Sequence, residues 1–308
     1  MTSDHALCSP PAPASNLLSA GFFARAAAAV AELARPTPQP DLHPAPVLVV
    51  DAYWQDLGEA MIDQVWPWHR LMTISTAEAY RGQVAAAWGG RAYHAAVLKA
   101  TQGTGYPRRA LAWFQRQWSA LDGPIARELR FLRGAYHYLM FRQDGRRQAD
   151  FYLDQVGGEL GGVNDILPIV DIEFGNDQAD NRKATRQQLV DCASEFTLRV
   201  RQRTGRTPIL YGGSALASLR IKDRLGCRWL WPAAYSPTLT RAEATSIGWT
   251  LDQVIMWQYT DGKKGAAVTT RGTKLPIGVP GVGRLDCSVV TQPGGPAGAR
   301  AALLGAAS

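Results

Sequence analysis

Short apolar runs recur along this chain at intervals that leave room for a helix between most of them. The first, VLVVD over residues 47–51, is continuously apolar, as strands buried on both faces of a parallel sheet tend to be. Further strand-like runs cover residues 94–100, 133–141, 168–174, 207–213, 228–235, 252–260 and 283–290. The pattern therefore predicts eight strands, beginning near Val47.

Segments of helical length separate the earlier strands. The clearest cover residues 107–121, 145–156 and 185–203, and the last ends at Gly205, a residue type that commonly terminates helices. Beyond residue 213 the connections are shorter and richer in turn-forming residues. Alternating strands and helices favour a parallel sheet, and eight such strands suggest closure into a barrel. An open doubly wound sheet is the structural alternative, although no Gly-rich phosphate loop follows the first strand.

The two ends of the chain differ from its middle in composition. Residues 1–46 are expected to form an N-terminal extension with a disordered start, a helix over residues 16–34 and a stiff proline-rich linker. The barrel is expected over residues 47–291. Residues 292–308 are rich in Gly, Ala and Pro, so we expect a flexible tail there.

Composition indicates a globular protein and argues against several kinds of function. Hydrophobic residues make up 46% of the chain and charged residues 19%, which supplies enough apolar material for a large core. The formal net charge is +7, but the arginines are scattered, so no nucleic-acid-binding stripe is predicted. The four Cys and five His show no metal-ligand spacing, and we therefore expect no metal and no cofactor.

Two acids, Asp171 and Glu173, alternate with apolar residues in the segment PIVDIEF. Residues two apart on a strand point to the same side, and ionisable side chains are rarely buried unless they are paired. The pattern therefore predicts acid/base chemistry, with capping of a neighbouring loop as the alternative. Asp51 and Asp286 lie in the first and last strands, which are neighbours in a closed barrel, and would face the same end of it.

Clustered carboxylates repel one another and raise at least one pKa, as a general acid at neutral pH requires. Glycoside hydrolysis is the commonest chemistry built on such a pair. Aromatic residues at other strand ends are candidates for the walls of a sugar cleft, although some must belong to the core. They are Tyr136, Tyr138, Tyr211, Trp231, Tyr235, Trp257 and Tyr259.

Nine segments in order give the chain a resemblance to the lysozymes of glycoside hydrolase family 25, which cleave peptidoglycan. They are VLVVDAYWQ, AVLKATQGTGY, RGAYHYLMF, QADFYL, PIVDIE, TGRTPILYGG, WPAAY, VIMWQYTDG and LDCSVV. The resemblance implies an incomplete TIM-like barrel of the (β/α)5(β)3 type, in which five β/α units precede three strands with little helix.

Through these matches, Glu173 resembles the general acid that protonates the glycosidic oxygen. Asp171 resembles its partner, which either stabilises the oxocarbenium-like transition state or positions the substrate's 2-acetamido group. Asp51 and Asp286 resemble the flanking acids that line the cleft and tune the central pair. The resemblance also implies a set of substrate-binding positions, which are Gln55, Lys99, Tyr136, Tyr138, Tyr211, Tyr235 and Gln258.

The chain departs from the family pattern near its first strand. The stretch after Asp51 is one residue shorter than usual, so that a small serine is lost or replaced by Tyr53. Residues 57–92 carry an insertion that either roofs the cleft or adds a helix pair. These differences bear on the exact substrate more than on the type of reaction.

The resemblance implies a retaining N-acetylmuramidase that cleaves the β-1,4 bond between N-acetylmuramic acid and N-acetylglucosamine in peptidoglycan glycan strands. The alternatives are a cell-wall glycan-binding barrel that has lost turnover and a chitinase-like hydrolase, of whose acidic signature only the final D-x-E is present. Two biological roles stay open as expectations, a phage-type endolysin and a secreted antibacterial effector. In the second case residues 16–34 are a candidate contact for a delivery or chaperone partner, and the alternative is an accessory helix packed on the barrel.

The N-terminus shows no recognisable signal peptide, and no apolar run is long enough to span a membrane. We therefore expect synthesis in the cytoplasm, no stable membrane insertion, and action on the cell wall in the periplasm of the producing or a target bacterium.

Overall fold

The computed structural model of the protein describes residues 46–53, 55, 62–80, 90–158, 160–175, 179–217, 225–236, 239, 249–262, 269–270 and 273–306. The chain divides into two units, Met1–Pro38 and Gln39–Ser308, and every described residue belongs to the second. The predicted disordered start, the helix over residues 16–34 and the proline-rich linker up to residue 45 lie outside the described residues. None of the described helices is long and apolar enough to cross a membrane.

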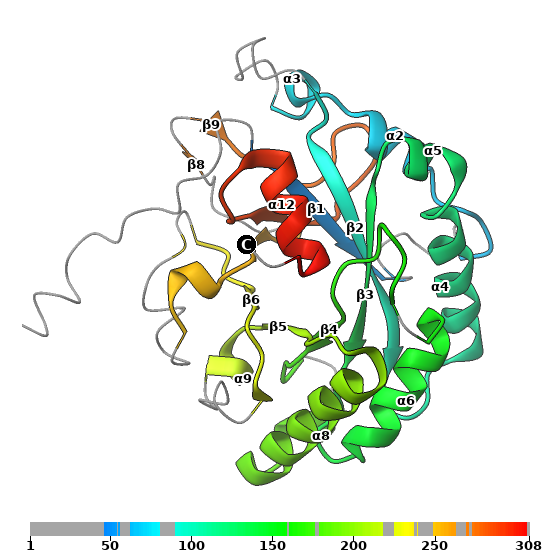
Figure 1. Ribbon diagram of the computed structural model, residues 1–308, viewed down its shortest axis with the longest axis vertical. Coiled ribbons are helices and arrows are strands. Elements are labelled where there is room, and N and C mark those ends of the chain that lie inside the picture. The colour runs from blue at the N-terminus through cyan, green and yellow to red at the C-terminus, as the bar shows by residue number, and fades with distance from the viewer. Residues whose placement is uncertain are drawn as a thin grey trace, which may run out of the picture. The chain divides into compact units, whose positions relative to one another are not determined.

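An eight-stranded sheet in the order β6-β5-β4-β3-β2-β1-β10-β7 forms the centre of the second unit (Figure 1). Its strands are β1 (Leu48–Ala52), β2 (Tyr93–Gln102), β3 (Leu132–Tyr138), β4 (Ile169–Asp171), β5 (Ile209–Gly212), β6 (Leu230–Pro232), β7 (Met256–Thr260) and β10 (Asp286–Val290). Each of the eight predicted strands is present. At the two edges of the sheet, the Ile255 N–H donates to the Leu230 carbonyl (2.9 Å) and the Ala234 N–H donates to the Gln258 carbonyl (3.1 Å). These bonds join the ends of the sheet into a nearly closed barrel, as predicted.

One strand differs in direction from the predicted parallel sheet. β1 to β6 pair in parallel, whereas β10 is antiparallel to both of its neighbours, β1 and β7. Parallel neighbours need a long crossover that is usually helical. The described part of the connection between β7 and β10 contains only the small hairpin of β8 (Thr269–Thr270) and β9 (Thr273–Lys274), so the chain returns antiparallel.

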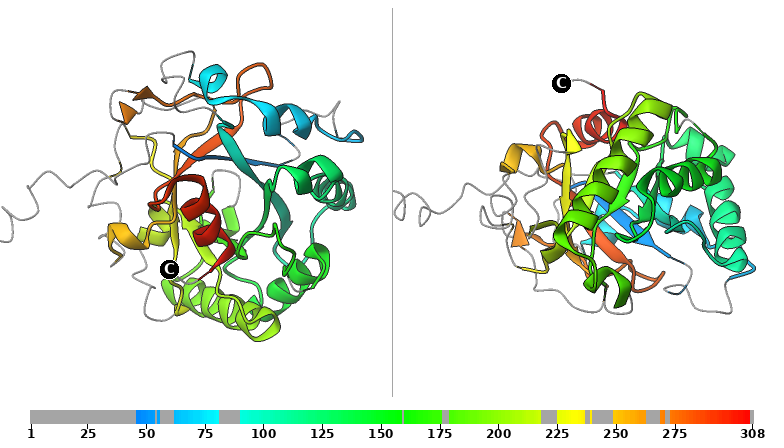
Figure 2. Two further views of the ribbon diagram at one scale, coloured as in Figure 1. Left: turned by 45° about the horizontal axis from the view of Figure 1, so that its top comes forward. Right: turned by 90° about the horizontal axis from the view of Figure 1, so that it is seen from below.

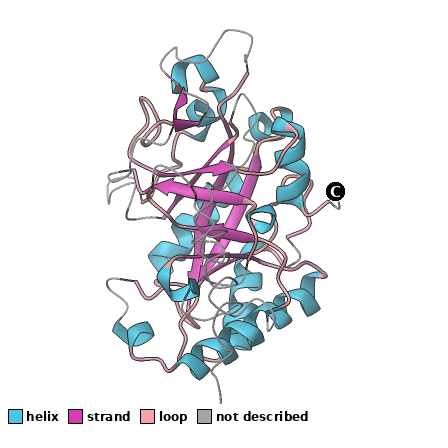
Figure 3. Ribbon diagram, turned by 90° about the vertical axis from the view of Figure 1, so that its left-hand side faces the viewer, coloured by secondary structure: helices cyan, strands magenta, loops and turns pink. Residues whose placement is uncertain are grey.

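Eight helices of the described residues accompany the first five strands (Figure 2). In the side view of Figure 3 the strands lie in the middle, with helices around them. The eight helices are α2 (Trp68–Thr73), α3 (Thr76–Ala79), α4 (Arg108–Ala120), α5 (Pro124–Glu128), α6 (Gly145–Val156), α7 (Ala179–Arg182), α8 (Arg186–Thr204) and α9 (Ser214–Ala217). The predictions for α4, α6 and α8 are confirmed, and α8 ends at Gly205 in the left-handed conformation (φ 68°). A short 3-10 helix (Leu251–Gln253) precedes β7.

Side chains on each strand alternate between two apolar layers. Leu48 and Val50 of β1 pack in a cluster that includes residues of the surrounding helices. Val49 belongs to a second cluster, to which all eight barrel strands contribute but none of the helices from α2 to α9. The second cluster is therefore the barrel interior. This alternation matters for function because it decides which strand-end side chains point into the mouth of the barrel.

The described part of the predicted insertion packs on the outside of the barrel. The Trp66 backbone N–H and the Trp68 indole N–H both donate to the Gln117 side-chain oxygen on α4 (2.9 and 3.0 Å). The Tyr80 hydroxyl donates to the Pro46 carbonyl (3.0 Å), just before β1. Of the two alternatives, residues 62–80 thus provide an added helix pair rather than a roof over the cleft.

The flexible tail predicted over residues 292–308 is wrong for most of its length, because Gly295–Leu304 form helix α12. Ala299 and Leu303 are buried in the barrel interior cluster, and the Leu167 N–H donates to the Leu303 carbonyl (2.9 Å). Small residues made this segment look unstructured, yet they let a helix approach the barrel closely. In the view of Figure 1, α12 lies in front of the middle of the ring of strands, whereas α4, α6 and α8 lie around its outside.

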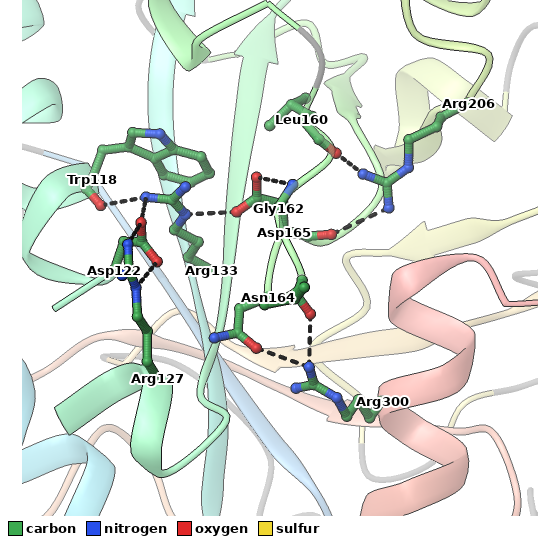
Figure 4. A network of polar contacts seen from close by, with 11 residues as sticks. Trp118, Asp122, Arg127, Arg133, Leu160, Gly162, Asn164, Asp165, Arg206 and Arg300 are labelled. Carbon is green, nitrogen blue, oxygen red and sulfur yellow. Dashed lines mark hydrogen bonds and ion pairs between the residues drawn. The ribbon is translucent and has the colours of Figure 1, made fainter. Parts of the chain in front are cut away.

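A network of arginines fixes α12 at the end of the barrel where the parallel strands begin (Figure 4). Arg300 donates to the Val163 carbonyl (2.7 Å) and the Asn164 side chain (2.8 Å), just ahead of β4. Arg206 donates to the Leu304 carbonyl (3.0 Å) and the Asp165 carbonyl (3.2 Å). The helix therefore closes the end of the barrel opposite the carboxyl ends of the parallel strands.

We expect Leu303→Ala to lower the free energy of unfolding by about 2–5 kcal/mol, because it leaves a cavity among fully buried side chains. Urea denaturation monitored by circular dichroism measures the change. The matched control is Leu198→Ala on α8, whose side chain is 43% exposed and should cost about 0.5 kcal/mol or less. Equal losses in the two variants would contradict a packing role for α12.

Candidate active site

Four acids meet at the mouth of the barrel, where the parallel strands end. Asp51 and Asp171 continue the alternation of Val49 and Ile169, which face the barrel interior. Asp286 pairs directly with Asp51 across the sheet. Because β10 is antiparallel, its first residue reaches the same end of the barrel as the last residues of the other strands.

The strand predicted over residues 168–174 is shorter in the structure, since β4 ends at Asp171 and Glu173 lies in the following loop. In that loop, side chains supply the hydrogen bonds to the backbone that a neighbouring strand would otherwise make. The Glu173 carbonyl accepts from the Asn181 amide (2.9 Å) and from the Tyr138 hydroxyl (3.2 Å). Glu173 is thereby held beside Asp171 although it is outside the sheet.

The central pair of acids lies in an environment that favours protonation. Asp171 is only 4% exposed, and its Oδ1 atom has no hydrogen-bond partner among the described residues. Burial raises its pKa well above the ordinary value, and the charges of Glu173 and Asp51 raise it further. Burial also raises the pKa of Glu173, which is half-buried. A pair of this kind can hold a proton at neutral pH and deliver it to a substrate.

Lys99 brings a positive charge to the same mouth. Its Nζ atom donates to the Gln102 side-chain oxygen (2.8 Å) and lies 4.6 Å from the centre of the Tyr138 ring. The rings of Tyr53 and Tyr106 are 5.6 and 5.7 Å away, so three aromatic faces surround the ammonium group. Lys99 opposes the effect of burial on the pKa of both central acids.

Gln258 lies at the centre of the other side of the mouth, fully buried on β7. Its Nε2 atom donates to Asp51 Oδ2 (3.0 Å) and Asp286 Oδ2 (3.3 Å). Its Oε1 atom accepts from the hydroxyls of Tyr211 (2.9 Å) and Tyr235 (3.0 Å). One amide thus connects the two flanking acids with two of the predicted substrate-binding tyrosines.

The remaining aromatic candidates divide between the mouth and the core. Trp257 and Tyr259 are 1% exposed and belong to the outer cluster, so they line no cleft. Trp231 is buried in the barrel interior and contacts the Tyr211 ring edge-on, with 4.7 Å between ring centres. Tyr136 is half-buried against the same interior cluster, one level below the mouth.

Three positions show where the sequence-based site differs from the structure. Gln55 is exposed after β1, and the contacts within the described part of the chain do not connect it to the acids. Conversely, Asn181 and Tyr106 take part in the site without having been predicted. Tyr106 could have been identified, since it ends the matched segment AVLKATQGTGY, whereas Asn181 reaches the site from a helix and has no such signal.

His137 lies behind the mouth in a buried polar chain. Its Nε2 atom contacts Gln148 Oε1 (3.0 Å), and its Nδ1 atom contacts Thr101 Oγ1 (2.8 Å). The Gln148 oxygen also accepts from the Met140 N–H (2.8 Å), so it is an acceptor and the proton of His137 is on Nε2. Burial lowers the pKa of His137 to about 3, and the ring therefore stays neutral.

This burial predicts a pH-dependent loss of stability. An unfolded histidine binds a proton below about pH 6.5, whereas folded His137 stays neutral down to about pH 3. The stability that His137 contributes is therefore present above pH 6.5 and lost as the pH falls through this window. We expect His137→Gln, which keeps one donor and one acceptor, to lose less stability between pH 7 and pH 4 than the wild type. Thermal unfolding across this range tests the difference, and His69→Gln on the surface should behave like the wild type.

The described residues include no group of three His, Cys, Asp or Glu side chains placed to hold a metal ion.

Comparison with known proteins adds a family and a fold. The model of the family Glycosyl hydrolases family 25 matches residues 83–267, more than half of the chain, and this range contains Asp171 and Glu173. The uncharacterized protein YegX of Escherichia coli O6:H1 is 26% identical over 166 residues, which make up 54% of this chain and 52% of YegX. The chain thus spans about half the length of the curated relative that it matches.

Two solved structures share the fold. The muramidase from Acremonium alcalophilum has a TM-score of 0.50 at 21% identity, and the match covers 70% of this chain and 89% of that one. The lysozyme from Aspergillus fumigatus has a TM-score of 0.51 at 18% identity, with 84% and 99% covered. At these identities the likeness establishes the architecture of the barrel.

Proposed function

Because this chain belongs to glycosyl hydrolases family 25, we propose that it is a peptidoglycan hydrolase that cleaves the β-1,4 bond between N-acetylmuramic acid and N-acetylglucosamine. The observation that carries the proposal is the buried pair of Asp171 and Glu173 at the mouth of the barrel, with the pKa of both carboxyls raised. The names of the muramidase and the lysozyme with this fold support the same activity.

In this proposal Glu173 is the general acid. It is the more exposed of the two central acids, and its backbone is fixed by Tyr138 and Asn181. Its carboxyl protonates the glycosidic oxygen as the bond to the anomeric carbon breaks, and the resulting carboxylate then accepts a proton from water. This exchange needs no cofactor.

Asp171 is the partner of the general acid. Its buried Oδ1 atom has no hydrogen-bond partner among the described residues, which suits a carboxylate that receives a group from the substrate. We propose that this group is the N–H of the 2-acetamido substituent, whose oxygen then faces the anomeric carbon. The configuration would be retained, with the acetamido group as internal nucleophile and Asp171 balancing the positive charge that develops on it.

The products of digestion test the proposed activity. Purified peptidoglycan is treated with the enzyme, the new reducing ends are reduced with borohydride, and the fragments are identified by mass spectrometry. Reduced muramic acid supports the proposal. Reduced glucosamine, or cleavage of peptide bonds alone, would refute it, as would intact glycan strands.

We also propose that the enzyme acts on the bacterial cell wall, and that residues 16–34 contact a delivery or chaperone partner. This contact is suggested by the apolar residues of the expected helix and by the proline-rich linker that follows it in the sequence. Deletion of residues 1–38, the first compact unit, should abolish transfer into target cells while the purified barrel still digests peptidoglycan. Undiminished transfer would exclude the contact.

A further inference from the structure

The sequence suggested that Gln258 binds substrate, but its surroundings give it a different task. The side chain is 0% exposed, and its two N–H groups and its carbonyl oxygen already make four hydrogen bonds within the protein. An amide has two protons to donate and room for two donors at its oxygen, so Gln258 has no hydrogen-bonding capacity left for a ligand.

The orientation of the amide follows from its neighbours. The side-chain nitrogen of Gln258, which can only donate, faces Oδ2 of both Asp51 and Asp286. The oxygen then faces Tyr211 and Tyr235, each of which has a single hydroxyl proton. Both protons are therefore directed toward Gln258 and away from the cleft.

We propose that Gln258 is a positioning residue whose side-chain oxygen accepts hydrogen bonds from the hydroxyls of Tyr211 and Tyr235. With their protons engaged in this way, both phenol oxygens can only accept hydrogen bonds from the substrate. The inference rests on the proposed function and deepens it, because it specifies the chemistry of two binding positions. A sugar hydroxyl or an amide N–H fits against these oxygens. A carbonyl or carboxylate oxygen is rejected there, since two acceptors would face each other without a proton.

The two tyrosines are placed to act on substrate in this way. Tyr235 is 41% exposed although its hydroxyl is held by Gln258 at the mouth of the barrel, so part of its side chain is accessible to a ligand. Tyr211 is half-buried and pairs directly with Asp171 between the parallel strands β4 and β5. A substrate held by these two oxygens would therefore lie directly beside the proton donor.

The test begins with Gln258→Glu, which preserves size but replaces the donor nitrogen with an oxygen. At pH 7 three carboxylates would then converge, and we expect kcat/KM on soluble peptidoglycan fragments to fall about 100-fold. Part of the activity should return near pH 5, where a protonated Glu can donate to one aspartate. Thermal unfolding provides a readout without activity, because the melting temperature of the variant should fall further below the wild type as the pH rises.

The matched control is Gln115→Glu on the exposed face of α4, which introduces the same charge far from the mouth. A Gln258→Glu variant that matches this control in activity and in melting temperature would overturn the inference. If the wild type does not digest peptidoglycan, the proposed function fails, whereas the unfolding measurements still test the hydrogen-bond arrangement.

A double-mutant cycle tests the direction of the hydrogen bonds and does not depend on Gln258→Glu folding. Tyr235→Phe alone should raise KM about tenfold with kcat changed by less than about threefold, since the acceptor is lost but no proton is transferred. In a Gln258→Met background the hydroxyl is no longer oriented, and the same change should raise KM less than about threefold. Equal effects of Tyr235→Phe in both backgrounds would show that Gln258 only fills space.

Discussion

Glu173→Gln is expected to reduce peptidoglycan hydrolysis by about 10³-fold while raising the melting temperature of the protein. The amide keeps the shape of the side chain but cannot deliver a proton, and general acid catalysis typically contributes a factor of this order. Stability should increase because burial raises the pKa of Glu173, so the ionised form is disfavoured in the folded state. The proposed general acid therefore lowers the stability of the folded protein.

The sign of the stability effect can be checked against pH. Above about pH 4.3 an unfolded glutamate loses its proton freely, whereas folded Glu173 resists ionisation, so the wild type is penalised and the variant is not. The gain in stability of the variant should shrink toward pH 3, where Glu173 of the wild type is protonated in both the folded and the unfolded state. Thermal unfolding and a dye-release assay on cell walls measure the two effects. Glu128→Gln on the exposed surface of α5 is the control, and hydrolysis by Glu173→Gln at the wild-type rate would refute the assignment of the acid.

The second large effect is expected at Asp171. Asp171→Asn should lower kcat by about 10³-fold and leave binding to cell walls largely intact, because a neutral amide cannot balance the charge that develops in the transition state. Binding is measured by sedimentation with purified walls, and kcat by release of reducing ends. Loss of binding in parallel with kcat would indicate a structural role instead.

Azide distinguishes the two possible tasks of Asp171. If the substrate's acetamido group is the nucleophile, azide should not restore turnover to Asp171→Ala, because that variant still lacks the charge that orients the acetamido group. If the carboxylate itself forms a covalent bond with the sugar, azide enters the vacated space and yields a glycosyl azide. Formation of that product would contradict the positioning role proposed above.

The apolar runs predicted all eight strands and the three long helices because each of these elements carries its own pattern of buried positions. They also predicted that Asp51, Asp171 and Asp286 would meet, since this follows from the ends of neighbouring strands. The direction of the last strand was not predictable in the same way. Strand direction depends on which neighbour the chain reaches next, and five residues of alternating character fit either direction.

Two other features depend on contacts between distant residues. The helical tail has a composition typical of a loose segment. Its order comes from the burial of Leu303 and from hydrogen bonds of Arg206 and Arg300 that join the tail to residues more than ninety positions away in sequence. The side chain of Gln258 makes four hydrogen bonds, to residues that are 23 to 207 positions away in sequence. A single sequence shows that such a side chain lies on a strand, but it does not show that all four of its bonds are made inside the protein.

The reversed direction of β10 also determines where the chain leaves the barrel. Asp286 begins this strand at the mouth, and the strand then carries the chain to the opposite end, where α12 seals the barrel. Any segment attached behind α12 therefore starts on the side remote from the cleft. A long glycan chain bound at the acids would not contact such a segment. A reporter or a wall-binding module fused behind α12 should therefore leave the digestion of long glycan chains unchanged.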